Sequence, residues 1–227
     1  MIFFINQFLP VFPVVVLWLV YFGALSTYFK KACLPVGREW LGRFVNFKIL
    51  LIFTAAFRAF QAGLLSITQY YVWSGAELTK VLVNSPLSPE VPLSSFLREN
   101  LSFIFNSKLG YFLFYSWGHF WANALLSIIV AFVFYAFLRV LRKHNDRFFY
   151  EGETELGLLL ALIVGWPSII LFIPLIFLAV VLVSVFRGVY LKETYTTLGA
   201  PMLLAALITM IFGSNLIEAL GLTVLKI

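Results

Sequence analysis

Residues that hold disulfides and metal ions are scarce in this chain. Among 227 residues there is one cysteine, Cys33, one aspartate, Asp146, and two histidines, His119 and His144. A lone cysteine excludes an intramolecular disulfide, and sites built on thiolates or imidazoles need several such ligands close together. The two histidines lie at opposite ends of one long apolar run, so we expect no metal site and no bound cofactor.

Charge is scarce as well, and apolar residues take its place. Charged residues make up 11% of the chain and hydrophobic residues 62%, with a mean hydropathy of +0.99. A soluble domain carries roughly 25% charged and about 45–50% apolar residues. We therefore predict an all-α, polytopic membrane protein surrounded by a lipid bilayer. The net charge of +6 would suggest a nucleic-acid partner in a soluble protein, but the basic residues cluster at the ends of apolar runs, so none is expected here.

About six apolar segments are candidate transmembrane helices, since roughly 20 residues cross the hydrocarbon core. The fourth ends at Gly165-Trp166-Pro167, because proline cannot continue a helix. Only this turn separates it from the fifth, so we expect the two to form an antiparallel hairpin. The six segments cover, approximately, residues 3–29, 49–73, 111–138, 153–165, 168–186 and 198–220.

Lysine and arginine predict the orientation of these helices. The loops after the first, third and fifth segments contain 11 of these residues, and the opposite side contains 4. Because basic loops stay in the cytoplasm, both termini are expected outside. Residues 74–107 then form one long external loop, in which Pro86, Pro89 and Pro92 disfavour a continuous helix.

Two polar stripes run along otherwise apolar segments. Arg58 and Gln61 share a face of the second segment, and His119 and Asn123 share a face of the third. Polar side chains in lipid turn toward partner helices or toward a cavity. The stripes are therefore interpreted either as interhelical hydrogen bonds or as the binding residues of a small transporter or lipid-binding protein.

Three glutamates, Glu151, Glu153 and Glu155, alternate at the start of the fourth segment. Acidic side chains near a helix N-terminus are stabilised by typically 0.3–1 kcal/mol each, which is one explanation for them. A catalytic or binding role for their carboxyl groups is the other.

Three motifs in the last part of the chain resemble those of a known family. They are Tyr150-Glu151-Gly152-Glu153-Thr154-Glu155-Leu156, Val164-Gly165-Trp166-Pro167 and Leu198-Gly199-Ala200-Pro201-Met202. In order, spacing and sidedness they resemble the Gly-x-Gly-Asp-x-Lys-Leu motif, the Leu-Gly-Trp turn and the Phe-Gly-Pro-Phe-Leu-Ala-like segment of type IV prepilin peptidases, which are membrane aspartic proteases. The resemblance covers about 80 residues and implies an N-terminal region of three helices at 1–148, a prepilin-peptidase-like region of three helices at 149–227, and a place in a prokaryotic cytoplasmic (inner) membrane.

The chain departs from this family at the catalytic positions. Glu153 replaces the motif aspartate, Glu151 the first glycine and Glu155 the lysine, and Asp146 is the only aspartate in the chain. In an aspartic protease two close carboxylates share a proton, and misplacing such a group by about 1 Å can cost roughly 100-fold in rate. The resemblance therefore implies a divergent, non-proteolytic relative that binds a pilin-like membrane helix or a type IV pilus assembly protein.

Three other functions remain open at this point. The first is an active prepilin leader peptidase that uses Glu153 with Glu155, Glu151, Glu39 or Glu193 as its second carboxylate. The second is the transporter or lipid-binding protein that uses the Arg58 and His119 stripes. The third is an assembly subunit whose contact surface is the proline-containing loop.

Overall fold

The computed structural model describes residues 2–33, 47–91, 99–145, 149–150, 152–192 and 197–225. Every regular element in these ranges is a helix, which confirms the all-α class. Five helices are long and apolar enough to cross a membrane: Val11–Phe29, Phe47–Gly75, Gly110–His144, Ile169–Tyr190 and Gly199–Ala219. These spans confirm a polytopic membrane protein.

Within the described part of the chain, the structure has five such helices where six spans were expected. Helix α9 (Glu153–Val164), the predicted fourth span, has 12 residues. At roughly 1.5 Å per residue it is about 18 Å long, well short of the ~30 Å hydrocarbon core. The signal that ends it, Gly165 followed by Trp166-Pro167, was identified correctly, but the segment before that turn is too short for a complete crossing.

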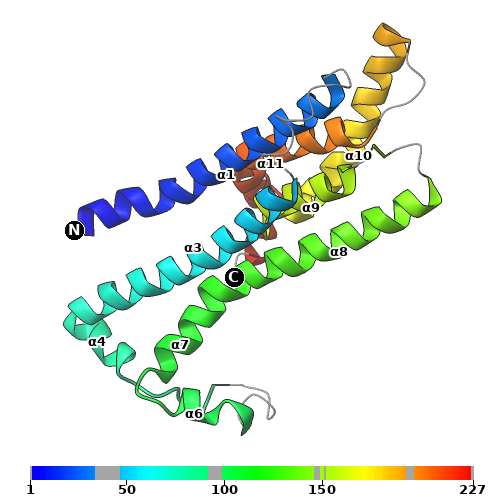
Figure 1. The fold of residues 1–227 in the computed structure, drawn as a ribbon. Coiled ribbons are helices and arrows are strands. Elements are labelled where there is room, and N and C mark those ends of the chain that lie inside the picture. The colour runs from blue at the N-terminus through cyan, green and yellow to red at the C-terminus, as the bar shows by residue number, and fades with distance from the viewer. Residues whose placement is uncertain are drawn as a thin grey trace. The chain divides into compact units, whose positions relative to one another are not determined.

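Figure 1 labels the helices in chain order. The other elements are α1 (Ile2–Cys33), α3 (Phe47–Gly75), α4 (Glu77–Val83), α6 (Ser102–Phe105), α7 (Gly110–Ser116), the π-helical turn η1 (Trp117–Trp121), α8 (Ala122–His144), α10 (Ile169–Phe186), the π-helical turn η3 (Arg187–Leu191), α11 (Gly199–Ala219) and the 3₁₀ turn η4 (Leu222–Leu225). They form two compact units. The first combines Met1–Phe57 with Leu126–Lys226, and the second is Arg58–Leu125.

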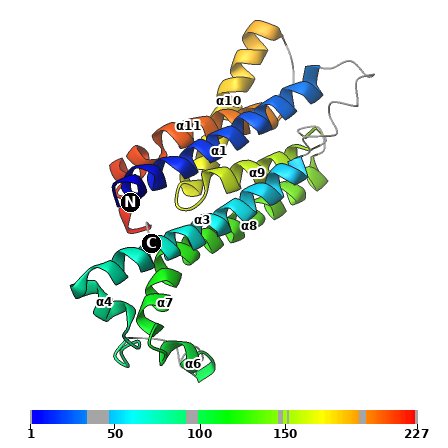
Figure 2. The same ribbon diagram turned by 60° about the vertical axis from the view of Figure 1, so that its left-hand side comes forward.

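Helix α9 occupies the centre of the first unit. It contacts α1, α10 and α11, and Figures 1 and 2 show these helices around it. Its residues from Leu156 to Ile163 are all buried. A helix that is apolar on every side is stable only when protein or lipid surrounds it completely, and here protein does so.

The turn after α9 forms hydrogen bonds with α8 and with η4, both in the same unit. Gly165 adopts a positive φ of 67°, which glycine tolerates without strain. The backbone N–H of Trp166 donates to Ser127 Oγ on α8 at 2.8 Å, and its indole N–H donates to the carbonyl of Leu225 in η4 at 2.9 Å. Helix α10 follows directly and contacts α9, as the hairpin prediction requires.

Aromatic contacts organise the second unit. Trp73 on α3 packs against Tyr111, Phe112 and Tyr115 of α7, with ring centroids 4.6–6.4 Å apart. Residues 92–98 of the predicted external loop lie outside the described residues. The described part contains α4 and the short α6, and Leu87 N–H closes it by donating to Phe105 O at 2.9 Å.

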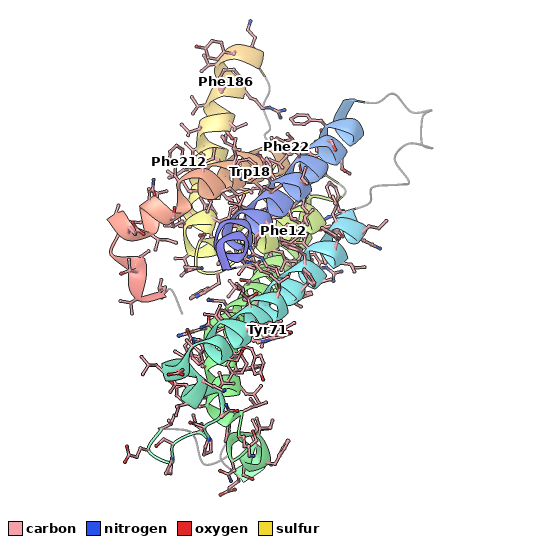
Figure 3. The ribbon with its side chains drawn as sticks, turned by 90° about the vertical axis from the view of Figure 1, so that its left-hand side faces the viewer. Phe12, Trp18, Phe22, Tyr71, Phe186 and Phe212 are labelled. Carbon is pink, nitrogen blue, oxygen red and sulfur yellow. The ribbon has the colours of Figure 1, made fainter. Side chains whose placement is uncertain are left out.

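The long helices expose large apolar side chains. Phe22 on α1, Phe186 on α10 and Phe212 on α11 each expose more than half of their surface, and Figure 3 shows the side chains that cover these helices. Exposed aromatic residues in such number are unfavourable in water and favourable in hydrocarbon. This surface is what a lipid bilayer requires.

Candidate functional site

Glu153 is the first residue of α9 and is almost completely buried, with 1% of its surface exposed. Its Oε1 accepts hydrogen bonds from Gly199 N–H at 3.0 Å and from the Tyr28 hydroxyl at 3.2 Å. Its Oε2 accepts one from Tyr150 N–H at 3.1 Å. The carboxyl thus joins α1, the segment before α9 and the first residue of α11.

The backbone around this carboxyl leaves little spare room. Gly152, directly before α9, has a φ of 93°, a conformation that glycine adopts readily. A Cβ atom at Gly199 would collide with the Tyr28 ring and with the Glu153 carboxyl. Glycine at 199 is therefore required by close approach, since only a residue without a side chain lets its N–H reach Oε1.

Burial dominates the electrostatics of Glu153, which lies outside the five spans. Removal from water raises the pKa of its carboxyl, because the charged form loses solvation. The N–H groups of Tyr150 and Gly199 and the side chains of Tyr28 and Thr197 lower that pKa, but by less than burial raises it. The site therefore binds a proton more readily than a free glutamate does.

The structure gives Glu153 and Glu155 different partners. Glu155 is half-buried, and its Oε2 accepts a hydrogen bond from Thr154 Oγ1 at 2.8 Å. Residues two apart on a helix point to nearly opposite sides, so the two carboxyl groups face different surroundings. Among the described residues, those that contact the Glu153 carboxyl are hydrogen-bond donors and none is an acid.

The other acids named as possible second carboxylates fall outside the described residues. These are Glu151, Glu39 and Glu193, and the same holds for the sole aspartate, Asp146.

The stripe residues Arg58, Gln61, His119 and Asn123 lie in the second unit, which also contains a hydrogen bond between two serines of different helices. Ser66 on α3 and Ser116 on α7 share a hydrogen bond between their hydroxyl groups. Arg58 and Gln61 are half-buried on α3. His119 is exposed and packs edge-on against Tyr115, with centroids 4.3 Å apart, while Asn123 Nδ2 donates to the His119 carbonyl at 3.2 Å.

Sequence reasoning identified Glu153 but missed its partners. Tyr28 precedes it by 125 positions, and no pattern in the first helix marks that tyrosine. Tyr150 was part of the first motif and Gly199 part of the third, and these were the available signals. Comparisons of the chain with protein-family models, with curated proteins and with solved structures find no match.

Proposed function

We propose that this chain is a non-proteolytic, prepilin-peptidase-like membrane protein that binds a membrane helix of the pilin type. The observation that carries the proposal is the environment of Glu153, which stands at the position of the motif aspartate. Both carboxyl oxygens accept hydrogen bonds from the protein's own groups: Gly199, Tyr28 and Tyr150.

Chemistry supports the loss of peptidase activity. An aspartic protease needs two carboxylates close enough to share one proton, so that one acts as acid and the other as base. Glu153 instead contacts donors among the described residues, and its side chain is buried away from any attacking water. Such a carboxyl holds helices together and leaves no acceptor facing a substrate.

The apolar outer faces of the first unit support a helical partner. Leu182 on α10 exposes 65% of its surface, and Phe177, Leu178, Val181 and Val185 on the same helix are similarly exposed. A single-span helix could pack there within the bilayer, where small energetic differences between helix and lipid contacts decide association. The proposed location is a prokaryotic cytoplasmic membrane with the basic loops in the cytoplasm.

Co-expression with a prepilin-like substrate tests both parts of the proposal. We expect an uncleaved leader on immunoblots where an active prepilin peptidase, run in parallel, removes it. A photo-crosslinking residue in place of Leu182 should capture the substrate helix, and one in place of the buried Leu159 should not. Leader removal that Glu153→Gln abolishes would show an active peptidase that uses glutamates, and equal capture at both positions would exclude the proposed face.

A further inference from the structure

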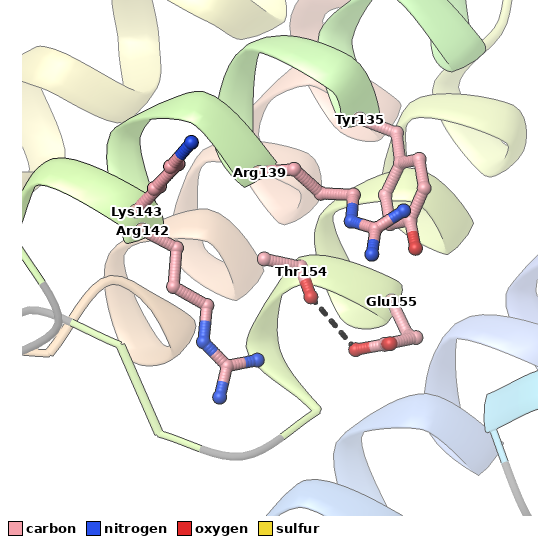
Figure 4. A pocket seen from close by; sticks show the side chains of 6 residues that line it. All are labelled: Tyr135, Arg139, Arg142, Lys143, Thr154 and Glu155. Carbon is pink, nitrogen blue, oxygen red and sulfur yellow. Dashed lines mark hydrogen bonds between the residues drawn. The ribbon is translucent and has the colours of Figure 1, made fainter.

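A second polar site lies where α8 ends and α9 begins, on the opposite side of α9 from the Glu153 carboxyl. It is a cavity of about 300 Å³, at the lower end of the range for small-ligand sites. The described residues that line it are Tyr135, Arg139, Arg142, Lys143, Thr154 and Glu155 (Figure 4). Neither the resemblance nor the proposed function assigns a role to it.

The lining carries an excess of positive charge. Arg139, Arg142 and Lys143 contribute three positive charges and Glu155 contributes one negative charge, so the described lining is net +2. Arg139 and Lys143 stand four residues apart on α8, a spacing at which like charges repel. A bound anion would remove that repulsion.

The donors suit a phosphate group in particular. Figure 4 shows the Thr154 hydroxyl, which donates to Glu155 Oε2, between the guanidinium groups of Arg139 and Arg142 in that view, with Lys143 extending away from them. A guanidinium presents a planar fork of N–H donors that matches two oxygens of a phosphate. The Arg139 guanidinium lies 5.6 Å from the centre of the Tyr135 ring, which limits where that fork can point.

The position of the cavity favours a lipid as the source of that phosphate. The three basic residues stand in the last turns of the Gly110–His144 span, where a transmembrane helix meets lipid headgroups. Phe132, seven residues before Arg139 and so on the same face of α8, is 51% exposed. An acyl chain could lie along that face while its headgroup occupies the cavity.

We propose that this cavity binds the phosphate of an anionic phospholipid headgroup. Basic pockets at the ends of transmembrane helices bind such headgroups in general. Free phosphate offers the same oxygens without the acyl chain, so the experiment separates the two sources. Glu155 opposes the anion and limits how much negative charge the site accepts.

Lipid binding by the purified full chain in detergent tests the proposal. Native mass spectrometry and the thermal unfolding midpoint are measured with phosphatidylglycerol, with phosphatidylcholine and with inorganic phosphate. We expect several-fold greater retention of phosphatidylglycerol than of phosphatidylcholine, with a matching rise in the midpoint. Arg139→Gln combined with Arg142→Gln should abolish the preference, and Lys48→Gln, which removes an exposed lysine outside the lining, should keep it.

A third variant distinguishes a lost site from a damaged fold. Glu155→Gln removes the only negative charge of the described lining, so it should strengthen phosphatidylglycerol retention, which a disrupted fold could not do. Inorganic phosphate could instead raise the unfolding midpoint of the wild type but not of the arginine variant, while neither lipid is preferred. That result would assign the site to free phosphate and overturn the proposal of a lipid ligand. Equal retention of both lipids by the wild type, or of phosphatidylglycerol by all variants, would overturn the site itself.

Discussion

A single carboxyl, that of Glu153, holds together segments that are far apart in the sequence. It accepts from Tyr28 near the end of α1, from Tyr150 before α9 and from Gly199 at the start of α11. Hydrogen bonds of this kind contribute modestly when made, but a buried donor left without its acceptor costs about 1–3 kcal/mol. The residue at the motif position therefore has a clear structural role in this protein.

The pKa shift of Glu153 makes stability depend on pH. Burial raises the pKa of the carboxyl in the folded chain above its value in the unfolded chain. The folded state thus binds the proton more tightly, and stability is highest below the unfolded pKa and falls as pH rises toward the folded one. Unfolding midpoints measured in detergent from mildly acidic to neutral pH should fall, and Glu153→Gln should flatten this dependence. A parallel decline in wild type and variant would assign the dependence to another group.

The close packing around Gly199 can be tested by a substitution at that residue. Gly199→Ala places a methyl group against the Tyr28 ring and the Glu153 carboxyl, and we expect a loss of about 1–3 kcal/mol from overpacking. Gly188→Ala is the matched control, because a Cβ at that position meets nothing within 4 Å. Thermal unfolding in detergent compares the two, and equal midpoints would contradict the contact.

How much of this site the sequence could predict depends on the distance between its parts. Glu153 was singled out because it stands in a local motif, within a few residues of Gly152 and Glu155. Tyr28 could not be singled out from the sequence, because its contact with Glu153 depends on how α1 packs on α9. The pattern of an apolar helix does not indicate at which angle it packs against another helix. The basic residues of α8 were recognised only as orientation signals, because their approach to Thr154 is again tertiary.

Among the elements, α9 differs most from its sequence-based expectation. Hydropathy and the Trp-Pro turn both indicated a span here, but α9 has 12 residues, ten of them buried, and it contacts α1, α10 and α11. A short apolar run is equally consistent with a partial helix inside a protein and with part of a span. Length was the deciding quantity, and it argues for the partial helix.

Ser127 fastens this element to α8. Its hydroxyl accepts the backbone N–H of Trp166 at 2.8 Å, and its side chain is 2% exposed. Ser127→Ala should therefore lower the unfolding free energy by about 1–3 kcal/mol, since a buried N–H loses its acceptor. Ser184→Ala, at an exposed serine of α10, should change it little. The two variants are compared by thermal unfolding in detergent. Equal unfolding midpoints would show that the hydrogen bond from Trp166 to Ser127 does not stabilise the fold.

The indole of Trp166 holds the 3₁₀ turn η4 in the same way. Trp166→Phe keeps an aromatic ring but removes the N–H that donates to Leu225 O at 2.9 Å. We expect about 0.5–1.5 kcal/mol of destabilisation and faster hydrogen exchange in residues 222–225. Trp117→Phe, at an exposed tryptophan, is the control, and unchanged exchange in Trp166→Phe would refute the contact.

For the whole molecule, the predicted orientation depends on α9 and α10 pairing as a hairpin, and not on whether α9 crosses the membrane completely. A hairpin made of α9 and α10 leaves the membrane on the side where it entered, whatever depth its turn reaches. The basic residues before α9 and after α10 are therefore still expected on one side, as the lysine and arginine count indicated. The sequence predicted the class of fold and most of the helices, because lipid imposes a long apolar pattern that is easy to recognise.

Site-directed labelling tests this orientation. In a Cys33→Ser background, Lys48→Cys and Asn145→Cys should react with a membrane-impermeant maleimide only after cells are opened. Leu78→Cys on α4, a position that is 90% exposed, should react in intact cells. The reverse pattern would invert the topology, and reaction of all three in intact cells would exclude it.

The short helix α9 also limits where the chain can change in length. Its first turn lies beside the basic end of α8, so we expect the turn after α9 to lie about 18 Å into a hydrocarbon core of ~30 Å. No water reaches that depth, and irregular backbone is tolerated there only where protein groups satisfy it, as Ser127 does for Trp166. An inserted residue would bring an N–H and a carbonyl with no partner. This turn is therefore expected to keep its number of residues.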